Sequence, residues 1–363
     1  MRENKLNVAS FFAGCGGFDL GFKNAGFNTV LANDFWNAAA RTFKKNNPEV
    51  DFIEDRIENI TEQRLNSILI EKGVKIDIVI GGPPCQCFTR LNNNWHNKRK
   101  QDQRNHLFKE YVRVIKYLKP SFVVMENVAD LLCRTNEKGQ LFKDLIIQSF
   151  RRAGYKVAYK VFETERYGVP QKRRRVIFLA SNNKNAALSF PEESSHISTT
   201  GEFLKNISNN ARLPNHEITI SEPRVQEIIK NIPSGGYYEH LPERLKTRKI
   251  RNGKLVVVKR YGSYYRRLKN DEPSITITNN YMIHPSKNRY LTNREKAALH
   301  TFPLDYEFEG TKEDVSQQIA NAVPPALAKC IATHLLKIMK EVNCKTTGSP
   351  KHFESFSSIF AEI

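Results

Sequence analysis

Apolar runs alternate with helix-like stretches between residues 6 and 180, and this alternation constrains the fold more than any other feature. Runs typical of buried strands cover residues 6–12, 29–33, 76–80, 122–126, 156–162 and 176–180. Segments with helical periodicity, such as 107–118 and 141–153, lie between them. Strands and helices alternating at this spacing predict an α/β fold, with a doubly wound, mostly parallel sheet covered by helices on both faces.

The chain changes character after residue 185. Residues 186–288 are rich in Asn, Ser, Pro, Lys and Arg and hold only short β-like pieces, and clear helices return at 292–300 and 325–339. We therefore expect a first domain at 1–185 and a smaller, mostly irregular or β domain at 186–288. Residues 289–344 would return to the first domain, and 345–363 would form a tail.

The chain is strongly basic, because 57 Lys and Arg stand against 38 Asp and Glu, a formal net charge of +19. This excess predicts a polyanionic partner, nucleic acid first and an acidic membrane surface second. No apolar run reaches the length of a membrane span, and the N-terminus lacks a signal-peptide core. Six cysteines do not make a disulfide framework in a chain this long. We expect an intracellular protein with reduced thiols, which excludes secreted, fibrous and membrane-spanning classes.

A glycine-rich turn follows the first expected strand, with Phe12, Gly14, Gly16 and Gly17. Ligands of open α/β sheets bind beyond the carboxyl ends of the strands, where this turn would lie. The spacing departs from the dinucleotide fingerprint, because the third required glycine position holds Asp19. Either the turn approaches an anionic group closely, or it is a tight strand-to-helix turn without a ligand.

Two residues after the second expected strand strengthen the case for a ligand. Asp34 lies about twenty residues beyond the glycine turn, where an acid typically accepts hydrogen bonds from ribose hydroxyls. Phe35 beside it could stack on a purine. Together with the glycines, this pattern favours a cofactor that contains adenosine.

Cys85 stands in a stiff loop after a buried strand, directly behind two glycines and two prolines. This position suits an exposed nucleophile, and the basic residues that follow, from Arg90 to Lys100, would favour the thiolate. The alternative is a buried and inert cysteine. A metal site using Cys87 is not expected, because no second pair of Cys or His offers zinc spacing.

Together these turns resemble one family, the cytosine-C5 DNA methyltransferases of bacterial restriction–modification systems, which use S-adenosylmethionine. The resemblance covers residues 8 to about 336 apart from the middle segment. It rests on the glycine turn, Pro84-Cys85-Gln86, Glu126-Asn127-Val128, Gln171-Lys172-Arg173-Arg174-Arg175, the stretch from Arg289 to Pro303, and Gln318-x-x-Asn321-Ala322-Val323-Pro324. Ser10 stands where the family commonly has aspartate, and Ala320 replaces a usual glycine.

The resemblance implies a reaction and a set of catalytic residues. The thiolate of Cys85 would add to C6 of a flipped-out cytosine, so that C5 can attack the cofactor's methyl group. Glu126 would donate a proton to N3, which requires a raised pKa, and Arg173 and Arg175 would orient Glu126 and the base. If these residues act only structurally, Glu126 caps a helix and the arginines belong to a solvated basic run.

The resemblance also implies a cofactor pocket without a metal. Asp55 is an expected acceptor for the adenine amine, although a surface turn acid is an equally good interpretation. The implied pocket residues are Phe12, Gly14, Gly16, Gly17, Asp34, Phe35, Asp55, Pro84, Leu107, Asn321, Ala322 and Val323.

The middle segment is the expected target-recognition domain. Every charged residue from Arg244 to Lys269 is basic, and tyrosines interleave with them. Phosphate contacts would supply affinity and a few side chains would read bases, although most lysines of such a run are usually solvated. The expected DNA-binding residues are Arg90, Arg104, Arg248, Lys249, Arg251, Lys259, Arg260, Arg266 and Arg267.

Three alternatives remain at this stage: a tRNA cytosine methyltransferase, a nicotinamide dehydrogenase and a catalytically inactive DNA-binding protein. For a DNA methyltransferase we expect double-stranded DNA as partner, a cognate restriction endonuclease acting on the same site, and no membrane. We expect a cytoplasmic bacterial monomer that associates with the nucleoid on DNA.

Overall fold

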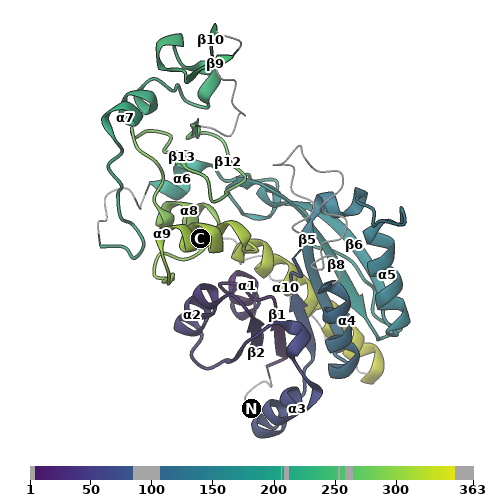
Figure 1. Ribbon diagram of the computed structural model, residues 1–363. Helices are drawn as coiled ribbons and strands as arrows, with labels where there is room; N and C mark the ends of the chain where they lie inside the picture. The colour runs from purple at the N-terminus through teal and green to yellow at the C-terminus, as the bar shows by residue number, and fades with distance from the viewer. Residues whose placement is uncertain are drawn as a thin grey trace.

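A seven-stranded sheet forms the centre of the protein (Figure 1). The computed structural model describes residues 5–84, 107–205, 207, 212–251, 254–257 and 265–347. The strand order is β3-β2-β1-β4-β5-β8-β6; neighbours from β3 to β5 are parallel, and β8 is antiparallel to β5 and β6. The strands are β1 (Asn7–Phe11), β2 (Asn28–Asp34), β3 (Asp51–Glu54), β4 (Ile78–Gly81), β5 (Phe122–Val128), β6 (Lys156–Glu163) and β8 (Arg174–Ser181). The predicted mostly parallel sheet is confirmed.

Helices cover both faces of this sheet because the side chains of a strand alternate between its faces. In β4, Val79 packs into the core under one set of helices, whereas Ile78 and Ile80 pack into the core on the opposite face. The first set is α3 (Glu62–Lys72), α4 (Leu107–Leu118) and α5 (Phe142–Arg152). On the other face lie α1 (Gly17–Asn24) and α10 (Pro325–Thr347), while α2 (Asn37–Asn46) packs beside β2 and β3.

The chain between β8 and α8 (Asn293–Leu299) contains little regular structure. Its elements are α6 (Thr200–Leu204), α7 (Pro223–Lys230), β9 (Arg248–Arg251), β10 (Lys254–Val257), β11 (Arg266–Arg267), β12 (Ser274–Ile275) and β13 (Met282–Ile283). Part of it has a small core of its own, built from Ile228, Ile229, Ile232, Tyr238, Leu241, Leu245 and Ile283. We call residues 212–290 the insert. Figure 1 shows β9 and β10 at its far end, well away from the sheet.

The last helices return to the sheet. Helix α8 and helix α9 (Lys312–Asn321) each begin with a capping box, Thr292 with Glu295 and Thr311 with Asp314. Among the described residues, the stretch 312–342 is long and apolar enough by composition to cross a membrane, with half of its most apolar window buried. It is not one helix, because α9 ends at Asn321 and α10 begins at Pro325. The apolar side chains of α10 pack on α1 and the sheet.

Candidate active site

The turns that follow β1, β2, β4 and β5 meet at one edge of the sheet. These strands are parallel, so their carboxyl ends point the same way. The first helix after β1 and the helix after β4 lie on opposite faces, which makes the space between β1 and β4 the switch point where such sheets bind ligands.

The glycine turn is built from left-handed backbone. Phe12, Gly14 and Gly16 have φ angles of 56°, 55° and 87°. For Phe12 this conformation is costly and needs support from its surroundings. A Cβ atom at Gly16 would lie 2.8 Å from the hydroxyl of Tyr306, whereas at Gly14 no described atom lies within 4 Å of that position. The turn is therefore packed on its Gly16 side and open on its Gly14 side.

Asp34 ties the glycine turn to the end of β2. Its carboxylate accepts hydrogen bonds from the backbone N–H of Gly14 at 2.8 Å and of Trp36 at 2.9 Å. Burial raises the pKa of Asp34, and these hydrogen bonds oppose the rise. Carboxylate oxygens have further lone pairs, so Asp34 can still accept from a ligand hydroxyl. Phe35 next to it is 56% exposed, and the Arg56 guanidinium lies 5.2 Å from its ring centroid.

Asp55 is already engaged by its own turn. Its carboxylate accepts hydrogen bonds from Asn59 Nδ2 at 2.8 Å and from the Arg56 backbone N–H at 2.7 Å, and Arg64 lies 3.6 Å away. The Asn59 hydrogen bond, then that of Arg56, lowers the pKa of Asp55. The carboxylate oxygens of Asp55 keep further lone pairs, as those of Asp34 do, so Asp55 can be both a surface-turn acid and an acceptor for an adenine amine.

Residues near the two ends of the chain meet at the glycine turn. A Cβ atom at Gly17 would overlap the carbonyl oxygen of Val323 and would lie 3.3 Å from the Ala322 side chain. Tyr306 donates a hydrogen bond to the carbonyl oxygen of Cys15. The structure thus brings the predicted pocket residues 322 and 323 against the predicted glycine turn. Asn321 is exposed, and its Oδ1 accepts from Gln317 at 2.7 Å.

Glu126 and Arg175 form a buried ion pair at the end of β5. Arg175 Nε lies 2.7 Å from Glu126 Oε1, and the two side chains are 14% and 11% exposed. Arg175 stands opposite Val128 in the antiparallel ladder, so it is a diagonal neighbour of Glu126 on the same face. Burial lowers the pKa of Arg175, and the charge of Glu126 raises it. A buried pair of this kind holds both groups in one orientation.

The turn after β4 packs against this ion pair. A Cβ atom at Gly82 would lie 3.2 Å from Glu126 Oε2, and Asn127 Nδ2 donates to the carbonyl oxygen of Pro83 at 2.9 Å. Pro84, the last described residue before the gap, is half-buried. The predicted nucleophile, Cys85, and the predicted DNA contacts Arg90, Arg104, Lys259 and Arg260 lie outside the described residues.

Arg173 hydrogen-bonds to the loop between α9 and α10. It is 2% exposed, and its Nη2 donates to the carbonyl oxygens of Ala320 at 2.8 Å and Ala322 at 3.3 Å. In the structure, Arg175 reaches Glu126, whereas Arg173 anchors the loop between α9 and α10.

The comparisons with known proteins agree with this geometry. The family of C-5 cytosine-specific DNA methylases matches residues 6–337. The chain belongs to this family. The type II methyltransferase M1.HphI of Haemophilus parahaemolyticus is 36% identical to this DNA methylase over 341 residues, covering 92% of this chain and 87% of that protein. M.NgoFVII of Neisseria gonorrhoeae, also a type II methyltransferase, is 33% identical over 354 residues, covering 93% and 88%.

The solved structures show the same fold at lower identity. An E. coli prophage protein described as a DNA modification methyltransferase superposes with a TM-score of 0.68 at 21% identity, covering 93% of this chain and all of that one. The methyltransferase EhMeth of Entamoeba histolytica gives 0.65 at 18% identity, covering 94% and 99%.

The predicted DNA contacts of this methylase differ in exposure. Arg248 and Lys249 are exposed on the β9–β10 hairpin, and Arg266 lies 5.2 Å over the ring of Tyr237. Arg251 ends β9. The predicted DNA contact at Arg267 is corrected by the structure. The Arg267 guanidinium is buried and donates to the carbonyl oxygens of Ile229, Ile232, His284 and Lys287 and to Asn288 Oδ1. These hydrogen bonds engage the N–H donors of Arg267 inside the insert, so Arg267 is not available to DNA.

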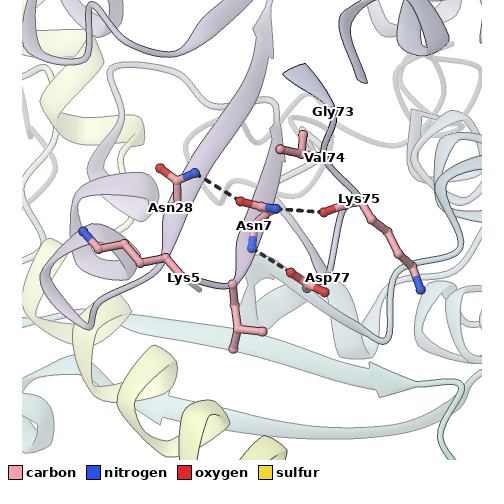
Figure 2. A pocket seen from close by; sticks show the side chains of 8 residues that line it. Lys5, Asn7, Asn28, Gly73, Val74, Lys75 and Asp77 are labelled. Carbon is pink, nitrogen blue, oxygen red and sulfur yellow. Dashed lines mark hydrogen bonds between the residues drawn. The ribbon is translucent and has the colours of Figure 1, made fainter. Parts of the chain in front are cut away.

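A cavity of about 640 Å³ lies at the opposite edge of the sheet (Figure 2). Its polar groups bind one another: the Asn7 backbone N–H donates to Asp77 Oδ2 at 2.8 Å, and Asn28 Nδ2 donates to Asn7 Oδ1 at 3.1 Å. Because it lies at the amino ends of β1, β2 and β4, it is separate from the candidate site. Within the described ranges, no group of three His, Cys, Asp or Glu is arranged to hold a metal ion.

Sequence reasoning missed several residues that shape the site. Asp19 was noted only for breaking the dinucleotide fingerprint, yet it is buried and accepts from Ser10 Oγ at 2.9 Å and Thr29 Oγ1 at 3.4 Å. The missing aspartate at position 10 was a signal that a carboxylate could come from elsewhere. No sequence signal paired Tyr306 with the glycine turn, since nearly 300 residues separate them.

Proposed function

We propose that this DNA methylase transfers the methyl group of S-adenosylmethionine to C5 of a flipped-out cytosine within a specific double-stranded DNA sequence. The observation that carries the proposal is the buried Glu126–Arg175 pair beside the turn at 82–84, which leads directly into Cys85. In this arrangement Glu126 would act as the proton donor and Arg175 as the orienting cation, with the nucleophile following Pro84 in the chain.

The residues at the carboxyl edge fit the cofactor. Gly14 leaves open space at the turn, Asp34 offers carboxylate lone pairs for ribose hydroxyls, and the exposed Phe35 ring offers a face for adenine. Phe12, Gly16 and Gly17 would hold the methionine part. Pro84, Leu107, Asn321, Ala322 and Val323 would complete the pocket. S-adenosylmethionine supplies an electrophilic methyl group there.

The chain's own groups act on the cytosine. The Cys85 thiolate would form a bond to C6, and the electron pair displaced onto the ring would be neutralised by a proton that Glu126 delivers to N3. C5 becomes nucleophilic and is methylated. Loss of the C5 proton to a base and return of the N3 proton to Glu126 would then expel the Cys85 thiolate from C6 and restore the aromatic ring. Arg175 keeps Glu126 in place throughout. Arg173 Nε is buried without a hydrogen-bond partner among the described residues, so it remains a donor for a ligand.

Residues 186–288 form the proposed recognition domain. A two-stranded ribbon such as β9–β10 fits the DNA major groove, and Arg248, Lys249 and Arg251 lie on it. Ile250 between them is 75% exposed, which leaves an apolar side chain for a base methyl group. Arg266 and the residues outside the described ranges, Arg90, Arg104, Lys259 and Arg260, complete the proposed contacts.

The similarity to proteins named type II methyltransferases supports a role in restriction–modification. In that role the enzyme works as a monomer on the nucleoid, in the cytoplasm of a bacterium, and protects a site that a cognate endonuclease cuts.

The test is methyl transfer from S-adenosylmethionine to DNA by the purified protein, with bisulfite sequencing to map the product. We expect 5-methylcytosine in one sequence context and none in a matched tRNA substrate. Methylation of an exocyclic nitrogen, or of tRNA instead of DNA, would overturn the proposal.

A further inference from the structure

His300, directly after α8, is fully buried between two polar partners. Its Nδ1 lies 2.9 Å from Nε2 of Gln171, which is also fully buried. Its Nε2 lies 2.8 Å from the carbonyl oxygen of Ala322. The imidazole therefore bridges the Gln171-to-Arg175 motif and the loop between α9 and α10.

The hydrogen bonds fix one tautomer of this imidazole. Gln171 Oε1 accepts from the Ile277 backbone N–H at 2.9 Å, so the Gln171 amide is oriented with its NH₂ group toward His300. Nδ1 must then accept, and Nε2 must carry the proton that it donates to the Ala322 carbonyl. Burial first, and the charges of Arg173 and Arg175, hold the pKa of His300 well below its ordinary value. The ring is thus neutral with its proton on Nε2.

The anchored carbonyl belongs to the wall of the proposed cofactor pocket. Ala322 and Val323 lie so close to Gly17 that a Cβ atom there would overlap the Val323 carbonyl oxygen. The Ala322 carbonyl oxygen accepts from His300 and from Arg173 Nη2 at 3.3 Å. A displacement of Ala322 would therefore move the surface against which the glycine turn rests.

The other end of the bridge reaches the chain that returns from the insert. Strand β12 pairs with β7 (Gln171–Lys172), and Ile277 follows β12. Through Ile277, Gln171, His300 and Ala322, one row of buried hydrogen bonds runs from the end of the insert to the cofactor turn.

We infer that His300 is a positioning residue for the cofactor pocket: its neutral imidazole fixes the carbonyl of Ala322 and so sets the wall opposite Gly17. The inference rests on the proposed use of S-adenosylmethionine. His300 does not touch the reacting atoms, so it acts on cofactor affinity and leaves the chemical step unchanged.

The test compares His300→Leu with His300→Gln. A glutamine amide carries an acceptor oxygen and a donor nitrogen on one carbon, as the imidazole carries its acceptor and donor nitrogens on Cε1, whereas leucine offers neither. Calorimetry with S-adenosylhomocysteine, without DNA, should show binding weakened about tenfold or more in His300→Leu and kept within about threefold in His300→Gln. In turnover assays, His300→Leu should raise the KM for S-adenosylmethionine while kcat stays within about threefold.

A matched control separates this role from general destabilisation. Phe150→Leu in α5 loosens a fully buried position of the sheet core away from the glycine turn, and it should not change affinity for S-adenosylhomocysteine. Normal binding by His300→Leu, or equal losses in both His300 variants, overturns the inference. If His300→Leu does not fold, ¹⁵N NMR of the wild-type imidazole decides, and a proton on Nδ1 overturns it. Failure of the wild type to bind S-adenosylhomocysteine would instead overturn the proposed function.

Discussion

The carboxyl edge of the sheet and the insert use buried charge in different ways. At the edge, Glu126 and Arg175 pair with each other on a ladder of seven- and eight-residue strands. In the insert, whose described strands have two to four residues, Arg267 binds four backbone carbonyls. At the carboxyl edge the long strands of the sheet fix the backbone. Glu126 and Arg175 can therefore serve the proposed reaction rather than hold the fold together. The insert has few hydrogen bonds between strands, so the side chain of Arg267 holds its backbone together.

The largest effect should come from the edge. Cys85→Ser should reduce methyl transfer at least about a thousandfold, because a hydroxyl is a far weaker nucleophile than a thiolate at neutral pH. Binding of S-adenosylhomocysteine and of DNA should survive. Turnover is measured with radiolabelled cofactor, and DNA containing 5-fluorocytosine should trap a covalent adduct with the wild type only. An adduct at Cys87 would show that the nucleophile was misassigned.

The second-largest effect should come from a substitution that disturbs the insert and leaves the carboxyl edge of the sheet intact. Arg267→Ala leaves four carbonyls of the insert without their donor, which should cost about 3 kcal/mol or more. We expect rapid proteolysis around residues 228–245, which hold most of the small core of the insert, and loss of DNA binding, with affinity for S-adenosylhomocysteine retained. Arg266→Ala is the matched control: it should leave proteolysis unchanged and weaken DNA binding only. If Arg267→Ala were as resistant as the control, the scaffold role of Arg267 would be wrong.

A smaller effect concerns how the free energy of unfolding depends on pH, through a buried carboxyl group near the carboxyl edge of the sheet. Burial raises the pKa of Asp19 from 3.8 to about 7, so the fold favours the protonated carboxyl. Its contribution to stability is full below pH 4 and is lost as pH rises toward 7, at up to about 1.4 kcal/mol per pH unit. Asp19→Asn should remove this slope and be the more stable protein at pH 8 by about 2 kcal/mol. Urea denaturation at pH 5 and pH 8 measures it; identical pH profiles would contradict the assignment.

The smallest effect should distinguish residues of the insert that contact DNA phosphates from residues that read bases. Lys249→Ala removes one proposed phosphate contact, so affinity should fall equally for all sequences and the salt slope of log K should drop by about one unit. Binding titrations across a salt series on cognate and unrelated DNA test this. A loss confined to the cognate sequence would instead assign Lys249 to base reading.

Sequence patterns anticipated the edge better than the insert for a physical reason. Long strands such as β5 and β8 contain continuous apolar runs that can be recognised, and their ends locate Glu126 and Arg175. Strands of two residues, such as β11 to β13, have no measurable period. Arg267 therefore looked like its exposed neighbours, and the direction of Arg173 depended on carbonyls nearly 150 residues away. Hydrogen bonds over such separations leave no trace in local periodicity.

The contact between the first and the last helix bears on how the protein is made. A Cβ atom at Gly21 in α1 would overlap Ala328 in α10, so the two helices touch backbone to backbone. A ribosome that has delivered α1 and most of the sheet has not yet released α10, and one apolar face of the nascent sheet stays uncovered until α10 emerges. Val323 arrives at the same late moment to complete the wall at Gly17. Translation products that stop before α10 should therefore lack the wall at Gly17 and be prone to aggregate.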